Sequence, residues 1–472
     1  MTACPELDTE TTTATAPQGW RGGLEHDGGT GETSQLAPRG RAYARFVLVL
    51  GALIAIGPLT IDTYLPSLPS ISRDLGASES AVQGTLTGIL VGMGLGQLLI
   101  GPLSDAVGRR KPLIAGIALH ILASLFCAVA PTVELLMAGR VLQGIGNAAV
   151  AVVAMATVRD LFAGTAAATL LSRLMLVMGL APVLAPTLGG FVLQVTSWRG
   201  VFVMLSVAGI GLVTLAATAL RETLPESRRR PLEPRAVLAT YGSLLRDRPF
   251  VGLVLISGLG FATLFSYIGG SSFVLQGIYG LSVQQFALAF GANSLGFLTG
   301  SQVNPLVVRR FGPRRVVRGA VTVASVASLL VLLAAVTGWG GLPGILVPLW
   351  FVLAAAGMTF PNTPALALTR HGEAAGTAAA MLGAAQFVIG GAAAPLIGLM
   401  GAGSAVPMAL VMAMAATGSA LVAAVTLRRG VIPDEPGDRP AMSHLGAAAD
   451  PQPSDVGGVA GREADGALPA GA

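Results

Sequence analysis

Charged residues are scarce in this chain. Only 11% of its 472 residues are Asp, Glu, Lys or Arg, whereas 53% are hydrophobic. Soluble globular domains carry about 25% charged residues, so the composition excludes an ordinary soluble protein. The apolar residues gather in runs of about 18 or more, the length that a membrane-spanning helix needs. The ten-residue alternation of an outer-membrane barrel does not occur, which leaves a helical protein with many spans.

Cysteine is almost absent too, since Cys4 and Cys127 are the two in the chain. One lies in a polar tail and the other in an apolar run, so neither a disulfide framework nor a cysteine metal site is expected. The phosphate-binding loop G-x4-G-K-[ST] is also missing, which excludes ATP hydrolysis by this chain as a driving force. We therefore expect no enzyme activity, no metal and no cofactor.

Twelve apolar runs account for most of the chain. The first extends from about 46 to 68 and is expected to be an uncleaved helix, because no basic and apolar leader follows Met1. The others lie near 80–102, 113–130, 134–156, 167–193, 200–220, 251–276, 283–307, 317–337, 343–368, 375–400 and 404–427. The fold class predicted is an all-α membrane protein with twelve transmembrane helices.

The longest internal polar segment divides these runs into two sets of six, and its prolines argue against one continuous helix. Two equal sets indicate an internal repeat of the kind found in transporters. The predicted parts are a disordered tail at 1–40, a six-helix bundle at 41–220, a cytoplasmic linker at 221–249, a second six-helix bundle at 250–429 and a disordered tail at 430–472.

The basic residues predict the orientation. Most of the 29 Lys and Arg residues lie in alternate loops and in the tails next to the membrane, and only Arg73 and Arg199 fall in loops on the other side. Cytoplasmic loops are the ones enriched in Lys and Arg, so both termini are expected in the cytoplasm. Because these cations belong to membrane loops, we expect no nucleic-acid partner.

One short loop between the second and third runs is dense in charge. It reads G-P-L-S-D-A-V-G-R-R-K at 101–111, from Gly101 onward. Asp105 can reach backbone N–H groups or an arginine, Gly108 makes the turn, and Arg109, Arg110 and Lys111 are expected at the lipid headgroups. The segment 309–315 occupies the same place in the second half but lacks the aspartate. A generic basic loop is the alternative interpretation.

Asp62 is the one acidic residue that lies well inside an apolar run. A lone carboxylate in a membrane is costly, and it usually marks the path of an ion or a substrate. The alternative is an acid at the end of the helix, already among the headgroups, because Pro58 and Pro66 shorten the regular helix.

Arg140 lies at a similar depth in the fourth run, and Gln143 shares its helix face. A buried arginine needs a carboxylate or carbonyl partner, so Asp62 or backbone groups are expected beside it. The alternative is an arginine that extends to the headgroups. In the fifth run, Pro182 and Pro186 are expected to kink the helix, and Gly189 and Gly190 allow close contact with a neighbour.

Isolated polar and aromatic residues interrupt the remaining runs. Such residues would suit a cavity for an amphipathic small molecule, although hydrogen bonding between helices explains any one of them equally well. The candidates for the cavity are Tyr64, Gln143, Tyr267, Phe273, Asn293, Phe360, Asn362 and Gln386. His120, in the third run, is interpreted as a packed neutral residue.

With these residues placed, the loop at 101–111 resembles the signature loop between helices 2 and 3 of the major facilitator superfamily. Other segments narrow the resemblance to the Bcr/CflA subfamily of drug/proton antiporters. They are I-D-T-Y-L-P at 61–66, V-R-D-L-F at 158–162, Y-I-G-G-S-S-F at 267–273 and G-T-A at 376–378. Arg140, Gln143 and Gly144 match the helix-4 motif. Pro186, Gly189 and Gly190 match the end of the helix-5 antiporter motif, in which Ala185 replaces the usual glycine.

The resemblance implies a monomeric exporter of hydrophobic drugs in a bacterial inner membrane, driven by the proton gradient. Asp62 would carry the proton, and Arg140 would couple proton and drug movement or stabilise the structure. Two alternatives stay open at this point. One is a dedicated exporter of a single endogenous metabolite, and the other is a membrane receptor or scaffold that transports nothing.

Overall fold

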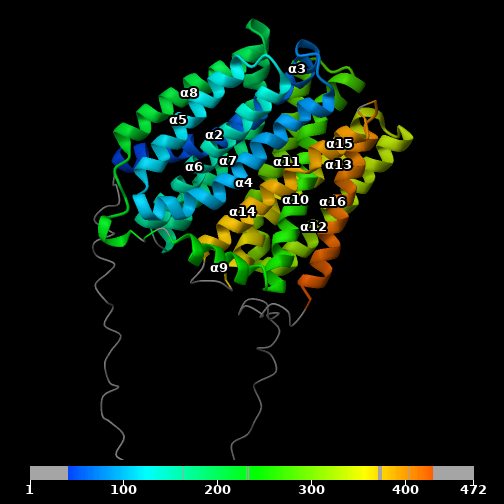
Figure 1. The fold of residues 1–472 in the computed structure, drawn as a ribbon. Helices are drawn as coiled ribbons and strands as arrows, with labels where there is room; N and C mark the ends of the chain where they lie inside the picture. The colour runs from blue at the N-terminus through cyan, green and yellow to red at the C-terminus, as the bar shows by residue number, and fades with distance from the viewer. Residues whose placement is uncertain are drawn as a thin grey trace, which may run out of the picture.

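The computed structural model describes residues 41–428 except 163, 230, 232, 370–374 and 402. The two predicted tails, 1–40 and 430–472, lie outside the described residues. The described chain is helical and forms two bundles side by side, drawn in blue to green and in green to orange in Figure 1. We call the end of the bundles that carries Arg41, Gly108 and Arg428 the tail end, and the opposite end the far end.

The first bundle follows the predicted runs but extends several of them by a turn or more. Its helices are α2 (Arg41–Asp62), the 3-10 turn η1 (Leu65–Ser67), α3 (Leu68–Asp74), α4 (Glu79–Val107), α5 (Arg110–Ala128), α6 (Val133–Leu161), α7 (Gly164–Val195) and α8 (Trp198–Ala219). The long apolar run at the start therefore contains a helix that ends at Asp62, followed by a tighter turn with Pro66 inside it.

The second bundle repeats this order. Its helices are α10 (Arg248–Ser272), the π-helix η3 (Phe273–Ile278), α11 (Val283–Phe311), α12 (Pro313–Thr337), α13 (Gly341–Leu368), α14 (Ala375–Gly391), α15 (Ala393–Leu399) and α16 (Val406–Thr426). Among the described residues, 11 helical segments are long and apolar enough to cross a membrane. The remaining one is α11, which has 29 residues but carries polar side chains such as Asn293 and Asn304. The prediction of a twelve-helix membrane protein is confirmed.

The segment between the bundles contains a short helix of its own. After the turn η2 (Glu226–Arg228), α9 (Pro234–Leu244) lies across the tail end and contacts both halves (Figure 1). The Tyr241 hydroxyl donates to the Leu98 carbonyl of α4 at 3.3 Å, and α9 also packs against α14. The prolines prevent one continuous helix, as the sequence predicts, but they leave room for these 11 residues.

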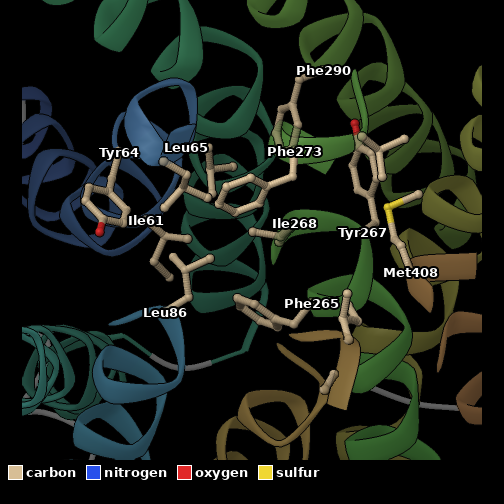
Figure 2. Packing of buried hydrophobic residues seen from close by; sticks show 14 of the residues in the cluster. Ile61, Tyr64, Leu65, Leu86, Phe265, Tyr267, Ile268, Phe273, Phe290 and Met408 are labelled. Carbon is tan, nitrogen blue, oxygen red and sulfur yellow. The ribbon is translucent and has the colours of Figure 1, made fainter. Parts of the chain in front are cut away.

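The hydrophobic core is continuous between the bundles only toward the far end. One apolar cluster there combines residues of both bundles, and Figure 2 shows Ile61, Leu65 and Leu86 facing Phe265, Ile268 and Phe273. Toward the tail end each bundle has a separate cluster, around Leu50 in the first and around Phe250 in the second. The two bundles are therefore sealed together at the far end.

Hydrogen bonds between the bundles reinforce this seal. The Ser272 hydroxyl donates to the Leu65 carbonyl at 2.7 Å, and the Thr87 hydroxyl donates to the Gly391 carbonyl at 2.8 Å. The Gln276 amide also donates to the Pro66 carbonyl, at 3.3 Å. Each bond uses a backbone carbonyl, and those of Leu65 and Pro66 belong to the turn that follows α2, where the regular helical pairing has ended.

The two halves share one structural detail at the tail end. Gly108 and Gly312 both have positive φ, 94° and 78°. Arg110, two residues after the first glycine, donates to the Ala217 carbonyl of α8, and Arg314 in the second half donates to the Leu427 carbonyl just after α16. Each arginine thus holds the end of the sixth helix of its own bundle, where free carbonyls attract a cation.

Candidate functional site

Asp62 is the last residue of α2 and is buried, with 4% of its surface exposed. The helix does end here, but the following residues Thr63 to Leu68 are buried as well. The carboxylate therefore does not reach the membrane surface, and the interpretation as a headgroup acid is wrong. Among the described residues it has neither an ion pair nor a hydrogen bond. Burial and the negative end of the α2 dipole both favour its neutral, protonated form.

Arg140 of α6 is fully buried beside the end of α2, which rules out the alternative of extension to the headgroups. Its Nη1 donates to the Thr60 carbonyl at 3.2 Å and to Gln143 Oε1 at 2.6 Å. The Thr60 carbonyl is one of the last carbonyls of α2, which lack a helical partner. Of the two expected partners, Asp62 or backbone groups, this structure has the backbone group.

The surroundings of Arg140 hold the guanidinium from two sides. Its carbon atom Cζ lies 4.6 Å from the centroid of the Tyr64 ring and 5.8 Å from that of Phe202. Tyr64 is fixed in turn by a 2.8 Å hydrogen bond between its hydroxyl and Thr85. The Nε and Nη2 atoms are buried without a hydrogen-bond partner among the described residues. The arginine that binds the Thr60 carbonyl, two residues before Asp62, therefore retains free donors.

Gly189 of α7 touches the chain immediately after Asp62. A Cβ atom at this position would lie 2.1 Å from the Thr63 carbonyl oxygen, a distance that no side chain can occupy. The neighbouring Gly190 is different, because its Cβ would meet only Val283 at 3.5 Å. Of the two predicted contact glycines, Gly189 is the one that allows α7 to pack against the Asp62 turn. Pro186 lies one turn before it inside the continuous helix.

At the tail end, Arg109 is the centre of a charged cluster. Its Nη1 donates to Asp105 Oδ1 at 2.5 Å and to Ser104 at 2.8 Å, and its Nε donates to Asp160 Oδ2 at 2.9 Å. These partners bury Arg109 to 8% exposure, so its guanidinium faces the carboxylates. Neighbouring Arg110 and Lys111 are exposed. Asp160, at the tail end of α6, was not predicted to take part.

Glu222, just after α8, completes this cluster and was also not predicted. Its carboxylate accepts hydrogen bonds from the backbone N–H groups of Arg109, Arg110, Thr223 and Leu224. It therefore lies at the N-terminus of α5, where a helix favours negative charge. Desolvation alone would raise the pKa of Glu222, but these N–H groups outweigh it and hold the pKa below its usual value.

Most of the predicted cavity residues are packed rather than exposed to a cavity. Tyr64, Gln143, Tyr267, Phe273, Asn293 and Asn362 are all buried. Tyr267 stacks on Phe290 with ring centroids 5.1 Å apart, and Asn362 donates to Asn304 Oδ1 at 2.6 Å. Only Phe360 and Gln386 of the candidates are half-buried. His120 is buried, as expected for a packed residue.

Four half-buried phenylalanines of the second bundle form a cluster, and the sequence predicted only Phe360 of the four as a cavity residue. Phe261 of α10 lies 4.5 Å from Phe360 of α13 and 5.6 Å from Phe387 of α14, measured between ring centroids. Phe297 of α11 lies 6.1 Å from Phe360. We call these four residues the aromatic quartet. Gln386, which precedes Phe387 in the chain, donates to the hydroxyl of Ser257, one turn before Phe261 on α10.

The chain matches a known family along most of its length. The family described as Major Facilitator Superfamily matches residues 48–395. An uncharacterized MFS-type transporter, YdgK of Bacillus subtilis, is 40% identical over 381 residues, which cover 79% of this chain and 93% of that protein. A bicyclomycin resistance protein homolog of Haemophilus influenzae is 30% identical over 367 residues, which cover 78% of this chain and 92% of that protein. The multidrug resistance protein MdtL of Escherichia coli is 33% identical over 271 residues, which cover 57% of this chain and 68% of that protein.

Solved structures agree on the fold. A D-xylose–proton symporter superposes with a TM-score of 0.65 at 20% identity, covering 83% of this chain and 99% of that chain. The human organic anion transporter MFSD10 gives a TM-score of 0.64 at 19% identity, and the superposition covers 83% of this chain and 100% of that chain. The chain belongs to the major facilitator superfamily, in its Bcr/CflA branch, and is a multi-pass membrane transport protein rather than an enzyme.

Proposed function

We propose that this chain is a proton-coupled exporter of small amphipathic or hydrophobic compounds, with antibiotics among them. The relatives named for bicyclomycin resistance and multidrug resistance support the class of cargo. The observation that carries the proposal is Asp62, a buried carboxyl for which the described residues provide no hydrogen-bond or ion-pair partner. It lies at the point where α2 ends and the seal between the bundles begins. The driving force is the proton gradient, with no bound cofactor.

Asp62 is proposed to carry the proton. Its neutral form fits the apolar seal in the present, far-end-closed arrangement, whereas a charged carboxylate would need a partner such as the free donors of Arg140. A proton taken up on one side would thus favour one arrangement of the bundles, and its release would favour the other. If cargo favours the opposite arrangement, the two binding events are coupled, and the coupling is reciprocal.

Transport into inverted membrane vesicles tests this role. With an imposed pH gradient, wild type should concentrate a neutral drug, whereas Asp62→Asn should still bind the drug but lose its accumulation. Glu134→Gln, which changes an exposed acid at the far end of α6, should transport like wild type. An Asp62→Asn variant that still accumulates drug under the gradient would exclude Asp62 as the coupling site.

The aromatic quartet, with the Gln386 amide, is proposed as the cargo contact. Half-buried aromatic rings offer large apolar surface, and the amide supplies a directional hydrogen bond. Phe360→Ala should weaken drug binding about tenfold, equal to about 1.4 kcal/mol. Phe351 lies on the same helix but is exposed on the outside of the bundle, so Phe351→Ala is the matched control. Equal effects of the two substitutions would contradict the assignment.

The proposed setting is the bacterial inner membrane, with the tail end in the cytoplasm and the protein acting as a monomer. The cations of the tail end support this orientation, since the clusters at 109–111 and 309–318 both lie there. A reporter that is active only in the cytoplasm should work when inserted at 225–245 and fail at 131–133. Activity at 131–133 would reverse the orientation.

A further inference from the structure

A groove on the outside of the second bundle opens at the tail end between α10 and α16. Its volume is about 490 Å³. The walls are apolar and come from both helices, with Val251 and Leu255 on α10 and Leu421, Val422 and Val425 on α16. Leu255, Leu421 and Val425 are 39%, 64% and 61% exposed. Because α16 packs against α10, α12 and α15 of its own bundle, the groove lies on the outside of that bundle.

A glycine creates the depression. Gly252 lies in the floor of the groove, and a Cβ atom there would be 2.2 Å from the Thr426 hydroxyl oxygen. The two helices therefore touch at Gly252, while the larger side chains on either side project past the contact. Because the floor is built by the helix contact itself, the groove is a fixed part of the bundle.

Charge in the groove is confined to its tail end and is positive. Among the described residues, Arg248, the first residue of α10, is the one charged residue that lines the groove, and its side chain is exposed. Within the described part of the chain, Arg248 has no hydrogen bond or ion pair through its side chain. The N-terminus of α10 adds partial positive charge, and Asp247, its N-cap residue, does not line the groove.

We propose that this groove binds one anionic phospholipid, with the phosphate on Arg248 and an acyl chain along the apolar walls. From Arg248 to Leu255 the helix rises about 10 Å, which is two-thirds of one leaflet of a hydrocarbon core about 30 Å thick. The cation is therefore at headgroup depth and the walls are at acyl-chain depth. A zwitterionic headgroup carries its own cation beside the phosphate, so the net positive groove favours an anionic one.

This site is independent of what the protein transports, because it lies outside the bundles and involves none of the residues assigned to proton or cargo. It would place a lipid at the junction of α9 and α10, since Leu245, just after α9, also lines the groove.

Native mass spectrometry of the purified full chain tests the proposal. The protein is titrated with phosphatidylglycerol or with phosphatidylcholine of the same acyl chains, and the dissociation constant of the first bound lipid is measured. Phosphatidylglycerol should bind more tightly, and Arg248→Gln should weaken it about fivefold while leaving phosphatidylcholine unchanged. Arg309→Gln removes an exposed tail-end arginine away from the groove and should change neither.

A second measurement locates the lipid. Val425→Trp places a fluorophore on the groove wall, and brominated phosphatidylglycerol in vesicles should quench it more strongly than brominated phosphatidylcholine at the same mole fraction. Adding Arg248→Gln should abolish that difference. Equal quenching by both lipids would identify ordinary surrounding lipid, and quenching by neither would identify a groove covered by other residues. Either result, or a preference that survives Arg248→Gln, overturns the proposal.

Discussion

The Arg140 guanidinium carbon lies 4.6 Å from the centre of the Tyr64 ring, while Nη1 of the same group caps the end of α2 at the Thr60 carbonyl. One buried cation thus binds the helix that ends at Asp62 and the aromatic residue that follows it. The arrangement needs a flat cation that can both stack on a ring and donate in its own plane, which arginine provides and lysine does not.

Arg140→Lys is therefore expected to fold but to be less stable, by about 1–2 kcal/mol for the lost stacking and hydrogen bonding. Arg140→Ala should cost more, because Gln143 Oε1 and the Thr60 carbonyl would lose their donor. Thermal unfolding of the purified protein in detergent measures both. Arg73→Ala, at an exposed far-end arginine, should leave the unfolding temperature unchanged. An unchanged unfolding temperature for Arg140→Ala would contradict a capping role.

The adjacent glycines of α7 offer a sharper comparison. Gly189→Ala should impair transport strongly, since its Cβ would lie 2.1 Å from the Thr63 carbonyl and must displace the turn beside Asp62. Gly190→Ala should be tolerated, because its contact is an ordinary one at 3.5 Å. Drug accumulation in vesicles, normalised to the amount of inserted protein, distinguishes them. Similar activity of both variants would mean that α7 can move away from the turn at no cost.

Gly108 and Gly101, seven residues apart in the same motif, should respond in opposite ways to alanine. Gly108 has φ 94° and ψ 168°, a conformation open essentially to glycine alone, and its Cβ would lie 2.5 Å from Glu222 Oε2. Gly108→Ala should lower the unfolding free energy by about 1–3 kcal/mol. Gly101 lies inside α4 with open space around it, so Gly101→Ala should be neutral or stabilising by up to about 1 kcal/mol. A neutral Gly108→Ala would show that the turn can rearrange.

Glu222 predicts a pH dependence of stability. Since its pKa is lower in the folded protein than in the unfolded chain, the carboxylate stabilises the fold above the ordinary glutamate value of about 4.3. That contribution is lost as the pH falls through the folded-state pKa. Between pH 7 and pH 4 the unfolding temperature should therefore fall more for wild type than for Glu222→Gln. At pH 7 the variant should be less stable by about 0.5 kcal/mol. Parallel curves for the two proteins would exclude the cap.

The sequence predicted the helices well because each membrane span is a local pattern about 20 residues long. It identified Asp62, Arg140 and the loop around Gly108 for a similar reason, since charge in or between apolar runs is visible residue by residue. Partners were harder to predict. Arg109 meets Asp160 and Glu222, which are 51 and 113 residues away, and spacing along the chain gives no information about which distant acid a loop will contact.

The exposure of the candidate cavity residues was predicted least well. These candidates are mostly polar residues within apolar runs, and packing buries Tyr64 and Asn293 while it leaves Phe261 and Phe387 half-buried. A phenylalanine in an apolar run has the same appearance whether it faces lipid, core or cavity. The arrangement of Arg140 shows a related limit. Similar depth suggested Asp62 as a possible partner, but the free carbonyl at the end of α2 lies within reach of the same guanidinium.

The charged cluster around Arg109 has no equivalent in the second half, where Pro313 takes the place of Arg109 and Arg309 that of Asp105. The imbalance extends to the described helices of the second half. Within 250–429 the Asp, Glu and His residues are His371 and Glu373, which follow α13 in the sequence and lie outside the described residues. The described helices from Arg248 to Arg428 include no carboxyl or imidazole group. A proton bound at Asp62 would therefore act on these helices through contacts between the bundles, such as that of Ser272 with Leu65. A chimera should accordingly inherit the pH profile of its first bundle and the cargo range of its second.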